Sequence, residues 1–150
     1  MKIPYLCLFG SIMTLALALT APAYADAPAG RYTASSGTVY DTKTKLTWQQ
    51  TVTPTTYSFA NATSYCAGLG ASVGGAGWRV PTIKELQTIL DYSQVSGPLI
   101  DHTAFPSTPI HYFWSSTPQA GTSGPWVVDF GIGNVTIPGM STSNNVRCVH

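Results

Sequence analysis

Two histidines and two aspartates in the second half of the chain could carry acid–base or metal chemistry. His102 directly follows Asp101, His111 lies further along the same stretch, and Asp129 could join them. Imidazole and carboxylate groups bind metals, and imidazole exchanges protons near neutral pH. The spacing fits neither a helix face nor a strand face, so it selects no catalytic or metal site. The alternative is surface histidines and an aspartate that caps a turn.

Four tryptophans offer a second chemistry, which is stacking against sugar rings. Tryptophan also fills the core of a small domain, so Trp48, Trp78 and Trp114 are expected to be mostly buried. Trp126 follows a loop rich in Gly, Ser and Thr and is the best exposed candidate, with Tyr112 next. No cofactor is assigned. The predicted ligand-binding residues are Tyr112, Ser115, Ser116, Trp126, His102 and His111.

Residues 1–25 have the parts of a signal peptide. Lys2 gives a basic start, an apolar run covers 12–19, and Ala23-Tyr24-Ala25 is a small-residue cleavage site. The apolar run is shorter than the roughly 20 residues that span a bilayer. A retained membrane anchor is the alternative. The pattern predicts a secreted or periplasmic protein without a stable anchor after cleavage.

Cleavage after Ala25 would leave a short mobile leader, 26–30, and one domain, 31–150. Loss of Lys2 lowers the Lys and Arg count from 7 to 6 (7 − 1 = 6), which equals the 6 Asp and Glu. A net charge near zero argues against a nucleic-acid partner held by bulk electrostatics. The polar surface must then come from Ser, Thr, Asn and Gly, which suits hydrogen bonding to neutral ligands.

Cysteine usage fits an oxidising compartment. The chain has 3 cysteines, and cleavage removes Cys7. In an exported chain the remaining two, Cys66 and Cys148, most simply form one disulfide. The bridge would close a loop of about 80 residues and contribute up to roughly 4 kcal/mol in the chain-entropy model. An intermolecular bridge or a reactive thiol pair is the alternative.

Two helices are predicted in the middle of the chain. The first covers about 58–69, with Ser58 as N-cap and Gly70 as C-terminal stop. Its apolar residues recur at helical spacing and place Cys66 on the buried face. The second helix covers about 83–92, and its start is indicated by Pro81, Thr82 and Glu85.

The start of the second helix is the clearest local signal in the sequence. Pro81 requires an extended residue before it, Thr82 is a natural N-cap, and Glu85 completes a capping box. Ile83 and Leu86 begin an apolar helix face behind the cap.

The charged residues near these elements have structural interpretations. Arg79 and Glu85 could form a functional charged pair, but the favoured interpretation is that Glu85 caps its helix and Arg79 donates hydrogen bonds to loop carbonyls. Arg147, beside the last cysteine, is expected to pair with an acid such as Asp129 or Asp41.

Strands are predicted on both sides of the helices. A first hairpin turns through 41–45, where Gly would be easier than Lys45 if the turn needs positive φ. A long loop without periodicity covers 93–109 and could be functional. Helices between two β regions favour an α+β fold with an antiparallel sheet. The predicted strands are 37–40, 46–49, 112–116, 126–130, 134–137 and 145–149.

Short motifs run through the chain in a fixed order. They are Gly37-Thr38-Val39, Tyr65-Cys66, Trp78-Arg79-Val80-Pro81-Thr82, Trp114-Ser115-Ser116 and Val146-Arg147-Cys148-Val149. In this order they resemble the Lcl C-terminal domain family over nearly the whole predicted domain. The chain departs from the family at Lys45, where Gly is usual, and at Val80, where Leu is commoner. The residues that we assign to the structural signature of this domain are Trp48, Trp78, Arg79, Pro81, Thr82, Glu85, Trp114 and Arg147.

The arrangement also resembles the C-type lectin-like fold. In that fold a cysteine of the first helix pairs with one in the final strand, which implies a Cys66–Cys148 bridge here. The calcium-dependent sugar-binding tripeptides of that superfamily, Glu-Pro-Asn, Gln-Pro-Asp and Trp-Asn-Asp, are absent from the sequence. The resemblance implies an α+β domain with two helices packed on an antiparallel sheet, a long loop region and one disulfide.

The function implied by the resemblance is that of an exported, non-enzymatic binding domain with adhesin-like recognition of a glycan or another cell-surface polymer. The namesake of the family adheres to sulfated polysaccharides, but the near-zero charge of this chain argues against such an anionic ligand. One alternative is a hydrolase or metal-dependent enzyme that uses Asp101, His102 and His111. Another is a structural domain of an envelope complex.

Overall fold

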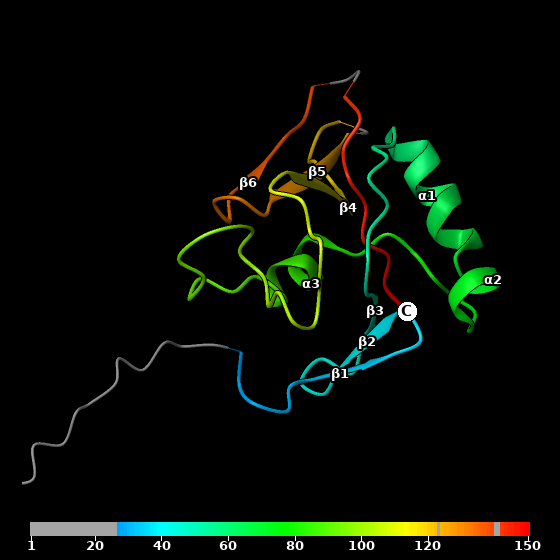
Figure 1. Cartoon of the computed structure of the whole chain (residues 1–150). Helices are drawn as coiled ribbons and strands as arrows, with labels where there is room; N and C mark the ends of the chain where they lie inside the picture. Colours follow the sequence, from blue (N-terminus) through cyan, green and yellow to red (C-terminus); the bar gives the residue numbers. More distant parts are fainter. Residues whose placement is uncertain (1–26, 123, 140–141) are drawn as a thin grey trace, which may run out of the picture.

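Two antiparallel three-stranded sheets carry the strands of the protein in the computed structural model, which describes residues 27–122, 124–139 and 142–150. The predicted signal peptide lies outside these residues. Figure 1 shows α3 between the two sheets, with α1 and α2 along one side. The elements are β1 (Tyr32–Ser35), β2 (Thr38–Asp41), β3 (Thr47–Gln49), α1 (Phe59–Gly68), α2 (Gly70–Val73), α3 (Ile83–Thr88), β4 (Tyr112–Pro118), β5 (Pro125–Asp129) and β6 (Val135–Thr136).

The first sheet has the order β1-β2-β3 and confirms the first predicted hairpin, in which Tyr40 of β2 lies opposite Thr47 of β3. The turn between them holds Lys45 at a φ of 64°. A Cβ atom is crowded by the backbone in that left-handed conformation, and glycine avoids the crowding. Strand β1, which the sequence did not predict, pairs antiparallel with β2 at the edge of the sheet.

The second sheet has the order β4-β5-β6 and confirms the second predicted hairpin. Tyr112 lies opposite Asp129, and Trp114 lies opposite Val127. The register shifts between Trp114 and Pro118, so the end of β4 bends relative to its partner strand. The predicted single sheet with two helices is therefore corrected, because the described residues form two separate sheets and three helices.

Helix α1 begins as predicted, because the Ser58 side chain accepts a hydrogen bond from the Asn61 backbone N–H. The predicted end near 69 is confirmed, because α1 ends at Gly68 with Leu69 as its C-cap, but Gly70 does not take the positive φ of a glycine stop. Leu69 keeps a right-handed conformation, with φ of −61°, and the additional helix α2 starts at Gly70. The stop comes at Gly74, whose φ of 81° cannot continue a helix.

Helix α3 has the predicted capping box. The Thr82 hydroxyl accepts from the Glu85 N–H at 3.3 Å, and the Glu85 carboxylate accepts from the Thr82 N–H at 2.7 Å. The helix ends at Thr88, earlier than predicted. Beyond the helix, the Asp91 N–H donates to the Leu99 carbonyl at 3.0 Å instead of to a carbonyl of the preceding helical turn.

The C-terminal segment, residues 144–150, forms isolated β-bridges instead of the predicted regular strand. Val149 exchanges two backbone hydrogen bonds of 2.9 Å with Arg79 and also bridges to β3. Asn145 bridges to β4. In Figure 1 this segment runs in red from the second sheet down to the first, so it connects elements that are distant in sequence.

Cys66 of α1 and Cys148 of the C-terminal segment form the predicted disulfide. The bridge lies in one of two buried clusters, together with Trp78 and Trp114. The other cluster contains Trp48 and lies between α3 and the two sheets. All three tryptophans are buried, as predicted. Within the described residues, no helix is long and apolar enough to cross a membrane.

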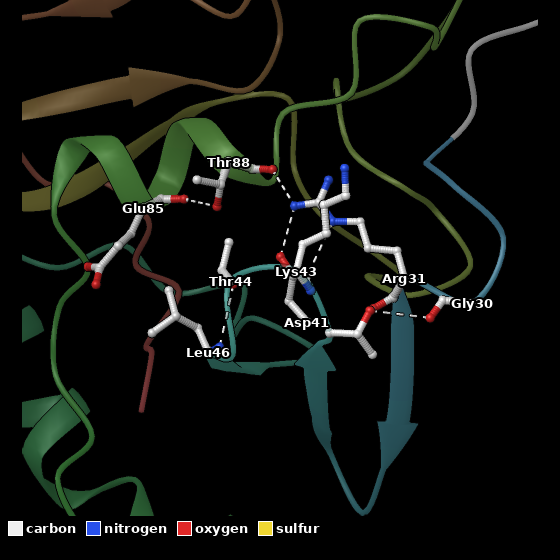
Figure 2. A network of polar contacts seen from close by, with 9 residues as sticks. Gly30, Arg31, Asp41, Lys43, Thr44, Leu46, Glu85 and Thr88 are labelled. Carbon is white, nitrogen blue, oxygen red and sulfur yellow. Dashed lines mark hydrogen bonds and ion pairs between the residues drawn. The ribbon is translucent and has the colours of Figure 1, made fainter.

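Asp41 binds Arg31 rather than the predicted partner Arg147 (Figure 2). Arg31 Nη2 donates to Asp41 Oδ2 at 2.8 Å and to the Thr88 carbonyl at 2.6 Å. Burial alone would raise the pKa of the Asp41 carboxyl, but hydrogen bonds from Arg31 and from the Lys43 N–H hold that pKa below its ordinary value. The contact joins the first sheet to the end of α3.

Arg147 lies in the interior without a carboxylate partner among the described residues, so its predicted ion pair is wrong. Its guanidinium donates to the Gln49 and Gln50 carbonyls at 2.6 Å each and to the Thr108 hydroxyl at 2.6 Å. It also lies 4.7 Å from the centre of the Phe105 ring. Neutral acceptors and an aromatic face therefore replace the expected acid.

The predicted contact of Arg79 with loop carbonyls is also replaced. Its guanidinium makes a two-point ion pair with the Glu85 carboxylate, at 2.8 and 2.7 Å. This hydrogen bond lowers the pKa of Glu85 to about 2. The predicted capping role of Glu85 is confirmed, whereas Arg79 forms the charged pair and connects the chain entering α3 to the cap of that helix.

Candidate functional site

Asp101 and His102 are engaged in local backbone contacts of the long loop. Asp101 Oδ1 accepts from the Thr103 N–H at 2.8 Å and from the Ala104 N–H at 2.9 Å. An aspartate that caps its own turn in this way is common in loops. His102 is exposed, and its Nε2 lies 2.9 Å from the Pro98 carbonyl oxygen. These contacts stabilise the loop.

His111 has a different neighbour. Its Nδ1 accepts from the Tyr112 N–H at 2.9 Å, and the two rings lie 5.7 Å apart, edge to face. Asp129 accepts from the Gly131 N–H at 2.7 Å. None of these contacts brings the two histidines together. The described part of the chain contains no group of three or more His, Cys, Asp or Glu that could hold a metal ion.

The other predicted ligand residues lie on the paired strands β4 and β5. Ser115 is fully buried and donates to the Trp126 carbonyl at 2.8 Å, so its hydroxyl faces the interior. Ser116 is exposed, and Tyr112 is 38% exposed. Trp126 is half-buried and is the least buried of the four tryptophans, as expected. None of these residues lines the cleft described next.

A cleft of about 430 Å³ opens beside a different set of residues. Its volume falls in the roughly 300–1,000 Å³ range of small-ligand sites. We call it the α1–β4 cleft, because α1 and β4 supply its two aromatic rings. It is lined by Ser58, Phe59, Trp114, Gln119, Thr122, Gly124, Pro125, Ile137, Pro138, Gly139, Thr142 and Ser143.

The two rings of the cleft are fixed by the elements that carry them. Phe59 is the first residue of α1, directly after the Ser58 cap. Its ring lies 5.7 Å from that of Trp114, at an interplanar angle of 63°. Trp114 Nε1 donates to the Tyr57 carbonyl at 2.6 Å, and the indole packs in the same cluster as the disulfide. The apolar side of the cleft is therefore rigidly supported.

Polar side chains form part of the remaining lining, beside the apolar Pro125, Ile137 and Pro138. Gln119 and Thr122 belong to the turn after β4, which is closed by a bond of 2.9 Å from the Gln119 N–H to the Gly124 carbonyl. The Thr122 hydroxyl donates to Gln119 Oε1 at 3.1 Å. Thr142 and Ser143 enter from the segment after β6. The cleft thus combines apolar and hydrogen-bonding surfaces from separate parts of the chain.

Some of these polar groups are free to meet a ligand. In the described ranges, the Gln119 side-chain nitrogen and the Ser143 hydroxyl have no hydrogen-bond partner. No residue that lines the cleft carries a charge. An arrangement of this kind can bind an uncharged molecule that has both an apolar face and hydroxyl groups. It supplies no nucleophile–base pair.

The sequence did not identify this cleft. Ser58 was singled out only as a helix cap, and Trp114, although considered with the other tryptophans for sugar stacking, was expected to be buried. The other lining residues come from stretches of Gly, Ser, Thr and Pro, whose composition is that of an ordinary loop. Four separate segments contribute, and only the folded chain brings them together.

Comparison with known proteins agrees with the resemblance found in the sequence. A family model described as the Lcl C-terminal domain matches residues 37–150, which is well over half of the chain. A search of curated proteins found no significant match.

Proposed function

The chain belongs to the Lcl C-terminal domain family, and from that premise we propose that it is a non-enzymatic binding domain whose α1–β4 cleft recognises a glycan or another cell-surface polymer. Such recognition is adhesin-like, because it holds the protein to a surface without changing the ligand. The proposal does not require calcium or another cofactor.

The observation that carries the proposal is the composition of the cleft. The Phe59 ring and the neighbouring Trp114 give an apolar surface, and the rest of the lining combines hydroxyl and amide groups with proline and isoleucine side chains. A sugar ring has the matching properties, since its C–H face is apolar and its hydroxyls donate and accept hydrogen bonds. Aromatic and hydrogen-bonding groups in one concave site fix both position and orientation of a ligand.

The enzyme alternative is less well supported by the geometry. It requires Asp101, His102 and His111 to act together on a substrate. Asp101 already accepts two backbone N–H groups, and the two histidines contact different segments. A general base must lie within hydrogen-bond reach of its proton source. A structural role in an envelope complex is the remaining alternative, and binding of a polymer by the isolated domain would distinguish the two.

We also propose that the protein is exported and adopts a lectin-like architecture. Export is supported by the signal-peptide pattern of residues 1–25 and by the Cys66–Cys148 disulfide, since disulfides persist in oxidising compartments. The lectin-like architecture is supported by the bridge from α1 to the C-terminal segment and by the long loop, 93–109. Secretion and periplasmic location both fit these features.

The proposal is tested by screening the domain against an array of glycans and surface polymers, with and without calcium. Phe59→Leu removes the ring but keeps apolar volume, and we expect it to weaken binding about tenfold, equivalent to about 1.4 kcal/mol. Tyr112→Leu is the matched control, because Tyr112 is an exposed aromatic outside the cleft. Circular dichroism of both variants verifies folding. Binding lost only in Tyr112→Leu would place the site elsewhere, and no binding to any polymer would contradict the function.

A further inference from the structure

We propose that the α1–β4 cleft selects a neutral saccharide and rejects sulfated and uronic-acid saccharides. This inference rests on the proposed function and goes further by naming the class of ligand. Three features of the cleft support it: the absence of charge, the free hydrogen-bonding groups and the apolar surfaces.

The charge of the lining excludes an anionic ligand. None of the cleft residues is cationic. Transfer of a sulfate or carboxylate from water into a site without a cation is unfavourable, because charged groups need charged or multiple hydrogen-bonding partners. The described arginines are engaged elsewhere, since Arg31 and Arg79 bind carboxylates and Arg147 is buried among carbonyls. Among the described residues that line the cleft, none supplies a counter-charge for an anion.

The free polar groups match a hydroxylated ligand. Gln119 lines the cleft from the turn after β4, and Ser143 lines it from the position just before the C-terminal segment, residues 144–150. Within the described residues, the Gln119 amide nitrogen and the Ser143 hydroxyl make no other hydrogen bond. Amide nitrogen donates, and hydroxyl both donates and accepts. Two such groups from different segments can contact different hydroxyls of one sugar.

The apolar surfaces complete the match. Phe59 is partly buried, so its ring is accessible from the cleft, and Ile137 is 44% exposed at the wall. Pro138 and Pro125 continue that wall. These groups can cover the C–H face of a pyranose ring, whereas a fully charged chain would lose hydration there without compensation. The three observations together favour a neutral saccharide over its acidic relatives.

The test compares neutral hexose oligosaccharides with their sulfated forms and with uronic-acid oligosaccharides on one array, at low and high salt. We expect signals for neutral members only, with little salt dependence, since screening acts on charges. Gln119→Ala and Ser143→Ala should each weaken binding about three- to tenfold, because each removes one hydrogen bond. Gln87→Ala is the matched control, as an exposed glutamine of α3 outside the cleft.

The outcomes separate this inference from the proposed function. Equal or stronger signals for sulfated members would overturn the selection for neutral ligands. If that binding were still lost in Phe59→Leu, the cleft would remain the binding site and only the ligand class would be wrong. No signal for any saccharide or polymer would overturn both. Unchanged binding in Gln119→Ala and Ser143→Ala would contradict the assigned contacts even if neutral members bind.

Discussion

Lys45 carries a side chain at a backbone position that favours glycine. Its φ of 64° is in the left-handed region, where a Cβ atom costs roughly 1–2 kcal/mol. We expect Lys45→Gly to raise the free energy of unfolding by about 1 kcal/mol, measured by urea denaturation. Lys43→Gly in the same turn is the control and should lower stability, because Lys43 does not have positive φ. Equal effects of the two substitutions would contradict the account.

Arg147 shows how a buried cation is held without an acid. Its side chain donates to two carbonyls and one hydroxyl, and burial lowers its pKa. Lysine cannot reach all three acceptors with one ammonium group. Because a buried carbonyl without a donor costs roughly 1–3 kcal/mol, we expect Arg147→Lys to lower the free energy of unfolding by at least about 2 kcal/mol.

A matched comparison for Arg147 is Arg79→Lys, in which the arginine side chain is 47% exposed. A solvent-exposed ion pair is typically worth less than about 1 kcal/mol. Arg79→Lys should therefore lower the free energy of unfolding by less than Arg147→Lys does. Denaturation of both variants under the same conditions gives the comparison. An Arg147→Lys variant as stable as the wild type would show that the three hydrogen bonds are not essential.

Single residues were predictable where chemistry leaves few choices. Cys66 and Cys148 had one simple pairing once the predicted signal peptide was set aside, and large aromatics such as Trp48 were expected inside. The partner of Arg147 was not predictable, because carbonyls and hydroxyls are present everywhere in a sequence. Only the fold places the Gln49 and Thr108 acceptors around its guanidinium.

At the scale of the element, the capping box of α3 makes stability depend on pH. The Arg79 hydrogen bond and the Thr82 N–H lower the pKa of Glu85 from 4.5 to about 2. Between these values the unfolded chain binds more protons than the folded one, so stability is full above about pH 5 and falls as the pH drops towards 2. We expect Glu85→Gln to make this fall shallower, measured by thermal unfolding across the pH range.

The control for that measurement is Gln87→Ala, which changes the same helix without touching an ionisable group. It should keep the pH dependence of the wild type. Asp41 also has a lowered pKa and contributes to the remaining slope. A Glu85→Gln variant with the same slope as the wild type would contradict the assigned role of Glu85.

Helix starts were predicted better than helix ends. The Ser58 cap and the Thr82–Glu85 capping box are local signals, and both are present in the structure. The end of α3 depends on a contact between Asp91 and Leu99, and a contact of that kind has no local sequence signature. The C-terminal segment likewise has strand-like composition, but it contacts several elements in turn and so forms bridges instead of a regular strand.

At the scale of the whole molecule, the disulfide ties α1 to the C-terminal segment. The bridged cysteines are separated by 82 positions, and a loop of that length gives roughly 4 kcal/mol of stabilisation in the chain-entropy model. We expect the double variant Cys66→Ser with Cys148→Ser to lose about 2–5 kcal/mol of stability, measured by denaturation. Reduced wild-type protein should behave in the same way. Two free thiols in the native protein, detected by mass spectrometry, would contradict the bridge.

The α1–β4 cleft is also a property of the whole molecule. Phe59, Trp114, Gln119 and Ser143 come from four segments, and loops with no periodic pattern supply most of the lining. Sequence reasoning directed attention to the long loop 93–109, because long loops without periodicity are often functional and this one holds His102. The register shift after Trp114 and the turn that follows β4 decide where the cleft lies, and neither has a reliable signature in the sequence.

The binding of a neutral saccharide in the α1–β4 cleft is tested most directly by titrating the isotope-labelled domain with the best neutral oligosaccharide from the array and following backbone amide chemical shifts. The predicted result is that shifts concentrate at Ser58, Phe59, Gln119, Gly124 and Ser143, all of which line the cleft. Shifts concentrated around the histidines and Tyr112, or an absence of shifts at saturating ligand, would contradict the account.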